Sequence, residues 1–133
     1  MSALPAVACD GEANGYQALQ QKLKKLRQAA DDLAERAGLV AQRMTANAKL
    51  AADVADMCAA AEVTEEHVGA INDISDAFDQ VATGGMGLVS AADNTGHAAA
   101  HLATTHQATY GGIYGSSSTS RVRQARPGFY LQR

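Results

Sequence analysis

Residues 16 to 61 read YQALQQKLKKLRQAADDLAERAGLVAQRMTANAKLAADVADMCAAA, and this stretch decides the fold. Steps of alternately three and four residues along it land on apolar or small side chains, apart from Asn47. A period of 3.5 keeps one stripe of a helix facing one partner, whereas a strand needs a period of two. The stretch contains no proline and therefore predicts one long helix with a heptad seam. The a series is Tyr16, Leu23, Ala30, Ala37, Met44, Ala51 and Cys58, and the d series is Leu19, Leu26, Leu33, Val40, Asn47, Val54 and Ala61.

A second helix is predicted to begin after Thr64. Thr64 is a suitable N-cap, and Glu65 and Glu66 place negative charge at the positive end of the helix dipole. The same stepping then resumes through Ile71, Ile74, Phe78, Val81, Gly85, Leu88, Ala92, Thr95, Ala99, Leu102, His106, Thr109 and Ile113. Two helices of matched length joined by a tight turn make an antiparallel hairpin, so the predicted fold class is all-α. In this hairpin the numbers of facing residues sum to about 126, which sets Tyr16 against Tyr110.

The chain divides into a helical region and two ends that lack periodicity. Residues 1–14 mix Pro5, Gly11 and small residues, and they are predicted to be disordered. Residues 15–112 form the predicted hairpin, which Gly111 and Gly112 end. Residues 113–133 are Ser-rich and then basic, and they are predicted to be a flexible tail.

The run Thr83–Gly87 contains Gly84, Gly85 and Gly87 inside the second predicted helix. Three glycines cost about 3 kcal/mol of helix stability relative to alanine. One interpretation is close packing of the two backbones, in a helix that is kinked but continuous. The other is a hinge at these glycines that breaks the helix in two.

Composition places the chain among cytoplasmic proteins. Aromatic residues make up 5% of the chain, so a hairpin packed mainly through alanine is more plausible than a compact globule. The two cysteines, Cys9 and Cys58, are far apart and suggest a reducing compartment. No signal peptide or membrane-spanning run is recognisable, so a cytoplasmic location, at most peripheral to the membrane, is expected.

Catalytic chemistry is not indicated, and no cofactor is expected. The glycine run has no following Lys-Ser or Lys-Thr and no preceding strand, so it does not match a phosphate-binding loop. Cys58 lies on the seam and is expected to be an inert thiol. Asp93, His97 and His101 are spaced by four residues and share a helix face that can hold a metal ion, although a structural zinc site needs four ligands. Solvated polar residues are the simpler interpretation of this group, and His106 is expected to be a hydrogen-bonded interior histidine.

The basic residues at the start of the first predicted helix would lie at the open end of the hairpin, beside the basic residues of the tail. A second interpretation of the chain is that these residues bind an anion or a partner, such as the phosphates of nucleic acid or lipid. The isoelectric point of about 5.7 argues against a DNA-reading module, and a solvated charged pole is the more ordinary explanation. Phe129 and Tyr130 are candidate anchors for docking the tail on an unidentified protein partner. The basic candidates are Lys22, Lys24, Lys25, Arg27, Arg121, Arg123 and Arg126.

One flank of the first helix has apolar positions that a single seam does not cover. A hairpin that leaves them exposed is expected to form a homo-oligomer, most simply two hairpins in a four-helix bundle. Asn47 on the seam either specifies the register or lies exposed at a kink. The predicted oligomer interface is Ala34, Ala41, Ala48, Leu50, Ala55 and Met57.

Several short segments resemble small proteins of Streptomyces and related actinomycetes that are catalogued as conjugal transfer proteins. The resemblance implies an accessory role beside plasmid transfer, in which a separate DNA-pumping motor supplies the energy. The matching segments are residues 15–26 (GYQALQQKLKKL), 31–35 (DDLAE), 105–112 (THQATYGG) and 126–130 (RPGFY).

A rival resemblance is to helical hairpins with a Trp-x-Gly turn that are secreted by type VII systems. The chain contains no Trp, and Tyr114 is not followed by an acidic residue at the spacing of that export signal. The first hypothesis is therefore a non-enzymatic, self-associating hairpin that serves a conjugative DNA-transfer or envelope-associated machine. The alternatives are a type VII-secreted hairpin and a metal- or phosphate-binding module.

Overall fold

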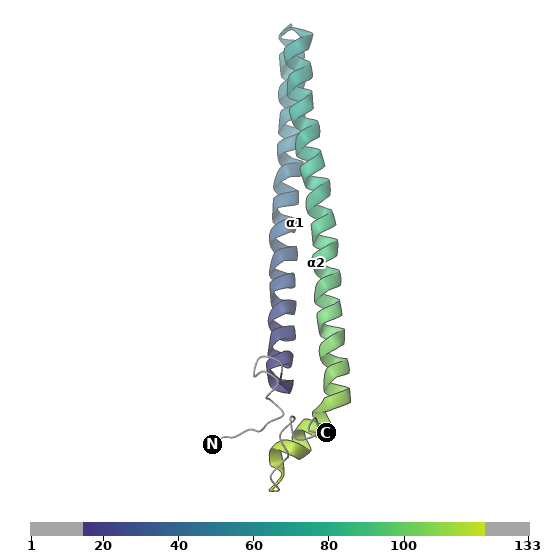
Figure 1. The fold of residues 1–133 in the computed structure, drawn as a ribbon. Coiled ribbons are helices and arrows are strands. Elements are labelled where there is room, and N and C mark those ends of the chain that lie inside the picture. Colours follow the sequence, from purple (N-terminus) through teal and green to yellow (C-terminus); the bar gives the residue numbers. More distant parts are fainter. Residues whose placement is uncertain (1–14, 122–133) are drawn as a thin grey trace, which may run out of the picture. The chain divides into compact units, whose positions relative to one another are not determined.

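The computed structural model describes residues 15–121, which form two helices, α1 (Tyr16–Ala60) and α2 (Glu65–Thr119). The helices pack antiparallel as a hairpin (Figure 1), which confirms the predicted all-α fold. The residues separate into unit 1, which contains residues 15–29 and 95–121, and unit 2, which is Ala30–Asn94. The predicted disorder of residues 1–14 and the tail anchors Phe129 and Tyr130 lie outside the described residues.

The turn between the helices is built by backbone hydrogen bonds at the end of α1. Val63 N donates to Cys58 O at 3.0 Å, and Glu62 N donates to Ala59 O at 3.1 Å. These two bonds define a Schellman motif, whose left-handed position is occupied by Glu62 with φ 60°. Thr64 occupies the predicted N-cap position of α2, where its carbonyl accepts from His67 N and Val68 N. Its hydroxyl lies 2.6 Å from Nδ1 of the His67 ring.

The register of the hairpin agrees with the predicted one in both units. In unit 2, a Cβ added at Gly85 would lie 3.1 Å from Ala41 Cβ, and Ser75 Oγ donates to Ala48 O at 2.8 Å. In unit 1, Tyr16 contacts the turn of α2 around Tyr110, where its ring stacks on His106 and Tyr114.

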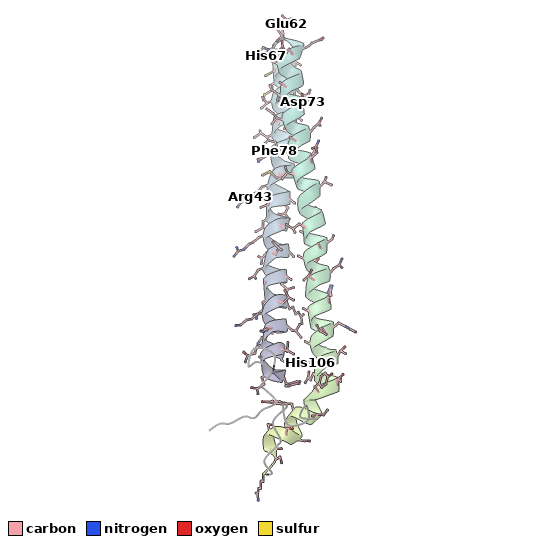
Figure 2. All side chains as sticks on the ribbon, in the orientation of Figure 1. Arg43, Glu62, His67, Asp73, Phe78 and His106 are labelled. Atoms are coloured by element: carbon pink, nitrogen blue, oxygen red, sulfur yellow. The ribbon has the colours of Figure 1, made fainter. Side chains whose placement is uncertain are left out.

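The seam of the structure differs from the predicted one at one position of each heptad: the e residue packs between the helices in place of the d residue. The buried residues of α1 are alanines at the a position and at the following e position, which lies four residues later, whereas the d residues Leu26, Leu33 and Val40 are 44–47% exposed. Small side chains let the two backbones approach closely, and larger d residues on the seam would hold the helices apart. Phe78 and His106, both labelled in Figure 2, are half-buried members of the corresponding series in α2. The buried alanines are Ala30, Ala37, Ala41, Ala48, Ala55, Ala82, Ala92 and Ala99, and Gly96 is buried as well.

The helix α2 continues without a break through Thr83–Gly87. Gly85 packs closely, since its added Cβ would also lie 3.5 Å from Ala37 O, whereas Gly84 and Gly87 have open space around them. Close packing therefore explains one of the three glycines. A hinge at Gly84, Gly85 and Gly87 stays a prediction about motion.

The end of α2 corrects the predicted boundary at residue 112. The helix includes both glycines and runs to Thr119, so residues 113–119 do not belong to a flexible tail. Tyr114 stacks on Tyr16 with ring centroids 4.8 Å apart, and Thr119 Oγ1 donates to Gly115 O at 2.8 Å. These contacts offset the cost of about 1 kcal/mol for each helical glycine. In Figure 1 the yellow-green end of α2 turns away from the axis of the green turns before it, as glycine pairs permit.

Candidate interaction surface and cationic groove

The seam divides unit 2 into two sides. Successive residues of a helix are rotated by about 100°, so the residue before a seam residue points to one flank of the hairpin. Because α1 and α2 run in opposite directions, these preceding residues lie on the same flank in both helices. They are the d residues Val40, Asn47 and Val54 of α1, with Ile74, Val81 and Leu88 of α2.

Large apolar residues dominate this flank, which we name the apolar side. Leu50 and Met57 extend it and are 62% and 61% exposed. They directly precede the a residues Ala51 and Cys58. Ile74 and Val81 are each 51% exposed. Large contiguous apolar patches on soluble proteins commonly mark interaction sites. The apolar side consists of Val40, Asn47, Leu50, Val54, Met57, Ile74, Val81 and Leu88.

The opposite flank of unit 2 carries mostly polar and acidic residues, with Met86 exposed among them. Asp79 and Thr83 follow seam residues of α2 and are exposed there, and Thr45 is the equivalent residue of α1. Lys49 and Asp53 form an exposed ion pair at 3.2 Å, which contributes little to stability. All the carboxylates of unit 2 lie outside the d and g heptad positions, which hold the apolar side together with the exposed Arg36 and Arg43. The hairpin of unit 2 is therefore amphipathic as a whole.

The predicted oligomer interface is corrected by the position of the seam. Ala41, Ala48 and Ala55 are 1–3% exposed because they pack inside the hairpin, and they are not available to a second copy in this fold. Ala34 is half-buried. Leu50 and Met57 are exposed on the apolar side, as the hypothesis requires. The sequence prediction placed Val40, Ile74, Val81 and Leu88 inside the seam. The alanines at successive e positions of α1 were the signal that the e residues could pack there instead.

The start of α1 and the end of α2 are joined in unit 1 by a stack of rings. The Tyr16 ring lies between His106, at a centroid distance of 5.0 Å, and Tyr114. Gln20 Nε2 donates to Ala103 O at 3.0 Å and lies 2.9 Å from His106 Nδ1. Because an amide nitrogen is only a donor, Nδ1 accepts and the ring proton is assigned to Nε2. His106 is thus hydrogen-bonded, as predicted, although it is half-buried and not fully interior.

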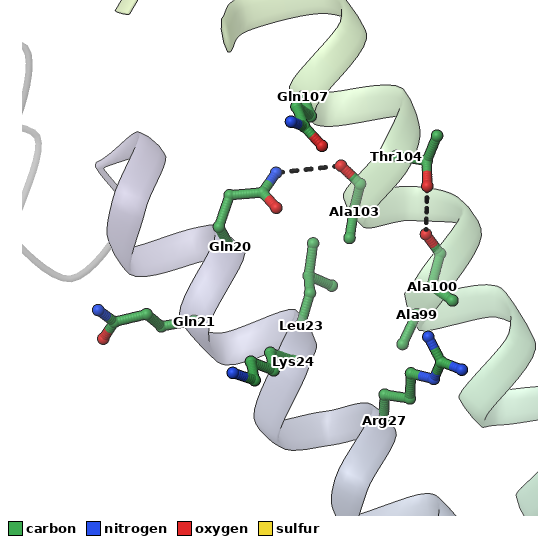
Figure 3. Close-up of a pocket in the computed structure, with 10 residues that line it drawn as sticks. All are labelled: Gln20, Gln21, Leu23, Lys24, Arg27, Ala99, Ala100, Ala103, Thr104 and Gln107. Atoms are coloured by element: carbon green, nitrogen blue, oxygen red, sulfur yellow. Dashed lines mark hydrogen bonds between the residues drawn. The ribbon is translucent and has the colours of Figure 1, made fainter.

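A groove of about 380 Å³ lies between the helices of unit 1, beside this stack (Figure 3). Its walls combine small apolar residues of α2 with Leu23 and two cationic residues of α1, and Arg27 extends across toward Ala99 in Figure 3. The lining residues are Gln20, Gln21, Leu23, Lys24, Arg27, Ala99, Ala100, Ala103, Thr104 and Gln107.

Only some of the predicted anion-binding residues line this groove. Lys24 and Arg27 line it, whereas Lys22 and Lys25 belong to the same helix turns but not to the lining. Arg121 is exposed after the end of α2, and Arg123 and Arg126 lie outside the described residues.

The predicted metal ligands are not gathered into a cluster of three within residues 15–121. Asp93, His97 and His101 are exposed, and no three His, Cys, Asp or Glu side chains of this part of the chain converge on one point. The spacing does place them along an outer face of α2, but neighbouring elements contribute no further ligand there. A metal site at these three residues stays a prediction.

Comparison with protein-family models, with curated proteins and with solved structures finds no match to this chain. Neither α1 nor α2 contains a stretch apolar enough, over a sufficient length, to span a membrane. The resemblance to conjugal transfer proteins stays a prediction.

Proposed function

We propose that this protein is a non-enzymatic interaction protein that associates with a second copy through the apolar side of unit 2. The observation that carries the proposal is the group of large exposed apolar residues on a flank of unit 2 that has no carboxylate. Leu39 and Met86 are also exposed but lie outside this flank. Two hairpins that bury this side against each other make a four-helix bundle, in which each helix has its apolar stripe covered.

The acidic flank favours a protein partner over a membrane surface. An amphipathic element that lies on a membrane normally carries Lys or Arg on its polar face. Unit 2 instead carries 12 Asp or Glu and 3 Lys or Arg, so anionic lipid would repel it. A second copy presents the same apolar side and keeps both acidic flanks in water.

The biological setting that we propose is an accessory or assembly role beside actinomycete conjugative DNA transfer or an envelope-associated machine. It is supported by the resemblance of residues 15–26 and 105–112. The self-associating hairpin would act there as a scaffold, while another protein supplies the energy. Deleting the gene from a donor strain should lower the frequency of plasmid transfer, and an unchanged frequency would contradict this role.

Light scattering after size-exclusion chromatography tests self-association. The wild-type chain should elute as a dimer or larger species, with or without a chelator, and Val81→Asp should lower its mass at equal concentration. Thr83→Asp is the matched control, because Thr83 is exposed on the acidic flank of the same helix. Circular dichroism verifies that both variants stay helical. A monomeric wild type would overturn the proposal, as would an equal loss of mass in both variants.

A further inference from the structure

We propose that the groove in unit 1 binds a single-chain amphiphilic anion, namely an alkyl chain that ends in a carboxylate. This inference is separate from the proposed self-association, which rests on unit 2. It combines an apolar floor, a cationic rim and the lack of any carboxylate in the surrounding unit.

The floor of the groove is apolar where three alanines of α2 line it, beside the polar side chains of Thr104 and Gln107. Ala99, Ala100 and Ala103 face Leu23 of α1, and the space left between them contributes to a volume of about 380 Å³. Small-molecule sites commonly have volumes of roughly 300–1,000 Å³ and mainly apolar walls. A flexible alkyl chain matches an open groove of this kind better than a rigid planar ligand does.

The rim supplies the charge that an anionic head group needs. The Gln20 amide and the Thr104 hydroxyl donate to the carbonyls of Ala103 and Ala100, at 3.0 and 3.1 Å. Lys24 and Arg27 are therefore the rim residues whose charge can hold a carboxylate. Arginine is well suited to this role, since its guanidinium donates two parallel hydrogen bonds to one carboxylate.

The charge distribution of the chain favours an anion in this unit. The described residues of unit 1 include five Lys or Arg and no Asp or Glu. Lys24 and Arg27 form no ion pair with a carboxylate among residues 15–121, although Asp31 follows Arg27 by one helical turn. A cationic amphiphile would be repelled by the positive charge of these residues. An anion without an alkyl chain would leave the apolar floor exposed to water.

The first test is an NMR titration of the full chain with laurate, kept below the concentration at which it forms micelles. Amide shifts should concentrate at Ala99, Ala100 and Ala103. Dodecyltrimethylammonium, which has the same chain and the opposite charge, and acetate, which has the head alone, should each bind at least tenfold more weakly. Equal binding of the cationic amphiphile would overturn the proposal, and so would shifts confined to the apolar side of unit 2.

Two variants locate the ligand. Ala103→Leu should fill the floor, and Arg27→Gln should remove the head-group partner, each weakening laurate binding at least tenfold. Ala108→Leu and Lys25→Gln are matched controls outside the groove and should bind as the wild type does. If Ala103→Leu loses helicity by circular dichroism, Arg27→Gln decides alone, because its exposed side chain is not part of the buried seam. Unchanged binding by Arg27→Gln would overturn the proposal.

Vesicles and inorganic phosphate separate the sources of such an anion. Binding of laurate, with competition by vesicles that contain an anionic phospholipid, would identify a site that also accepts membrane lipid. Binding of laurate without such competition would identify a site for the free fatty acid. Binding of vesicles or phosphate without laurate would show simple surface electrostatics and would contradict the groove.

Discussion

At the scale of single residues, Glu62 carries backbone strain that a glycine would relieve. Its φ of 60° is the left-handed conformation, which costs an L-residue roughly 1–2 kcal/mol. Glu62→Gly should therefore raise the free energy of unfolding by about 1 kcal/mol, measured by thermal denaturation. Glu66→Gly is the control, since the same change inside α2 should lower stability by about 1 kcal/mol. A loss of stability in Glu62→Gly would contradict the Schellman geometry.

The glycines of α2 should differ from one another when each is replaced by alanine. Gly84 has open space around it, so Gly84→Ala should stabilise the helix by about 1 kcal/mol. Gly85→Ala should gain less, because the new Cβ lies 3.1 Å from Ala41 Cβ and the helices must separate slightly. Equal gains measured by chemical denaturation would show that Gly85 is not a close-packing position.

At the scale of the elements, the last turns of α2 depend on the rings that contact α1. Tyr16→Ala removes two stacked contacts, each worth roughly 0.5–1.5 kcal/mol, and should speed amide exchange in residues 113–119. Tyr110→Ala is the control, because Tyr110 is 52% exposed and contacts only the edge of the cluster through His106. Exchange rates that stay slow after Tyr16→Ala would show that these turns are helical without help from α1.

Both helices and their turn could be predicted from the sequence, because a heptad period and helix-end signals are local properties of the chain. The side of each helix that faces the seam could not. Leucine and valine at d look like core residues beside alanine at e, and hydrophobicity alone ranks them so. In the structure Ala41, Ala48 and Ala55 fill the seam, because small side chains let the two helix backbones come close together. That closeness depends on both helices at once and cannot be judged from either sequence segment alone. The groove was invisible for the same reason, since Leu23 and Ala103 are 80 positions apart.

At the scale of the whole molecule, the chain separates its charges and its apolar surface. The described residues of unit 1 include Lys and Arg but no Asp or Glu, whereas unit 2 is strongly acidic. High salt should therefore weaken the binding of an anion to unit 1. Self-association through apolar contacts should persist or strengthen, because salt screens the repulsion between two acidic units. Laurate titration and light scattering at low and high salt check the two opposite responses, and parallel responses would contradict them.

Protection of a single thiol tests the central claim most directly. In a chain with Cys9→Ser and Cys58→Ala, one cysteine is placed on the apolar side by Val81→Cys or on the acidic flank by Thr83→Cys. The rate of labelling by a thiol reagent is then measured over a wide range of protein concentration. Association through the apolar side predicts that labelling of Val81→Cys slows several-fold as the concentration rises, while Thr83→Cys keeps one rate. Equal rates for Val81→Cys at all concentrations, or equal slowing of both cysteines, would contradict the account.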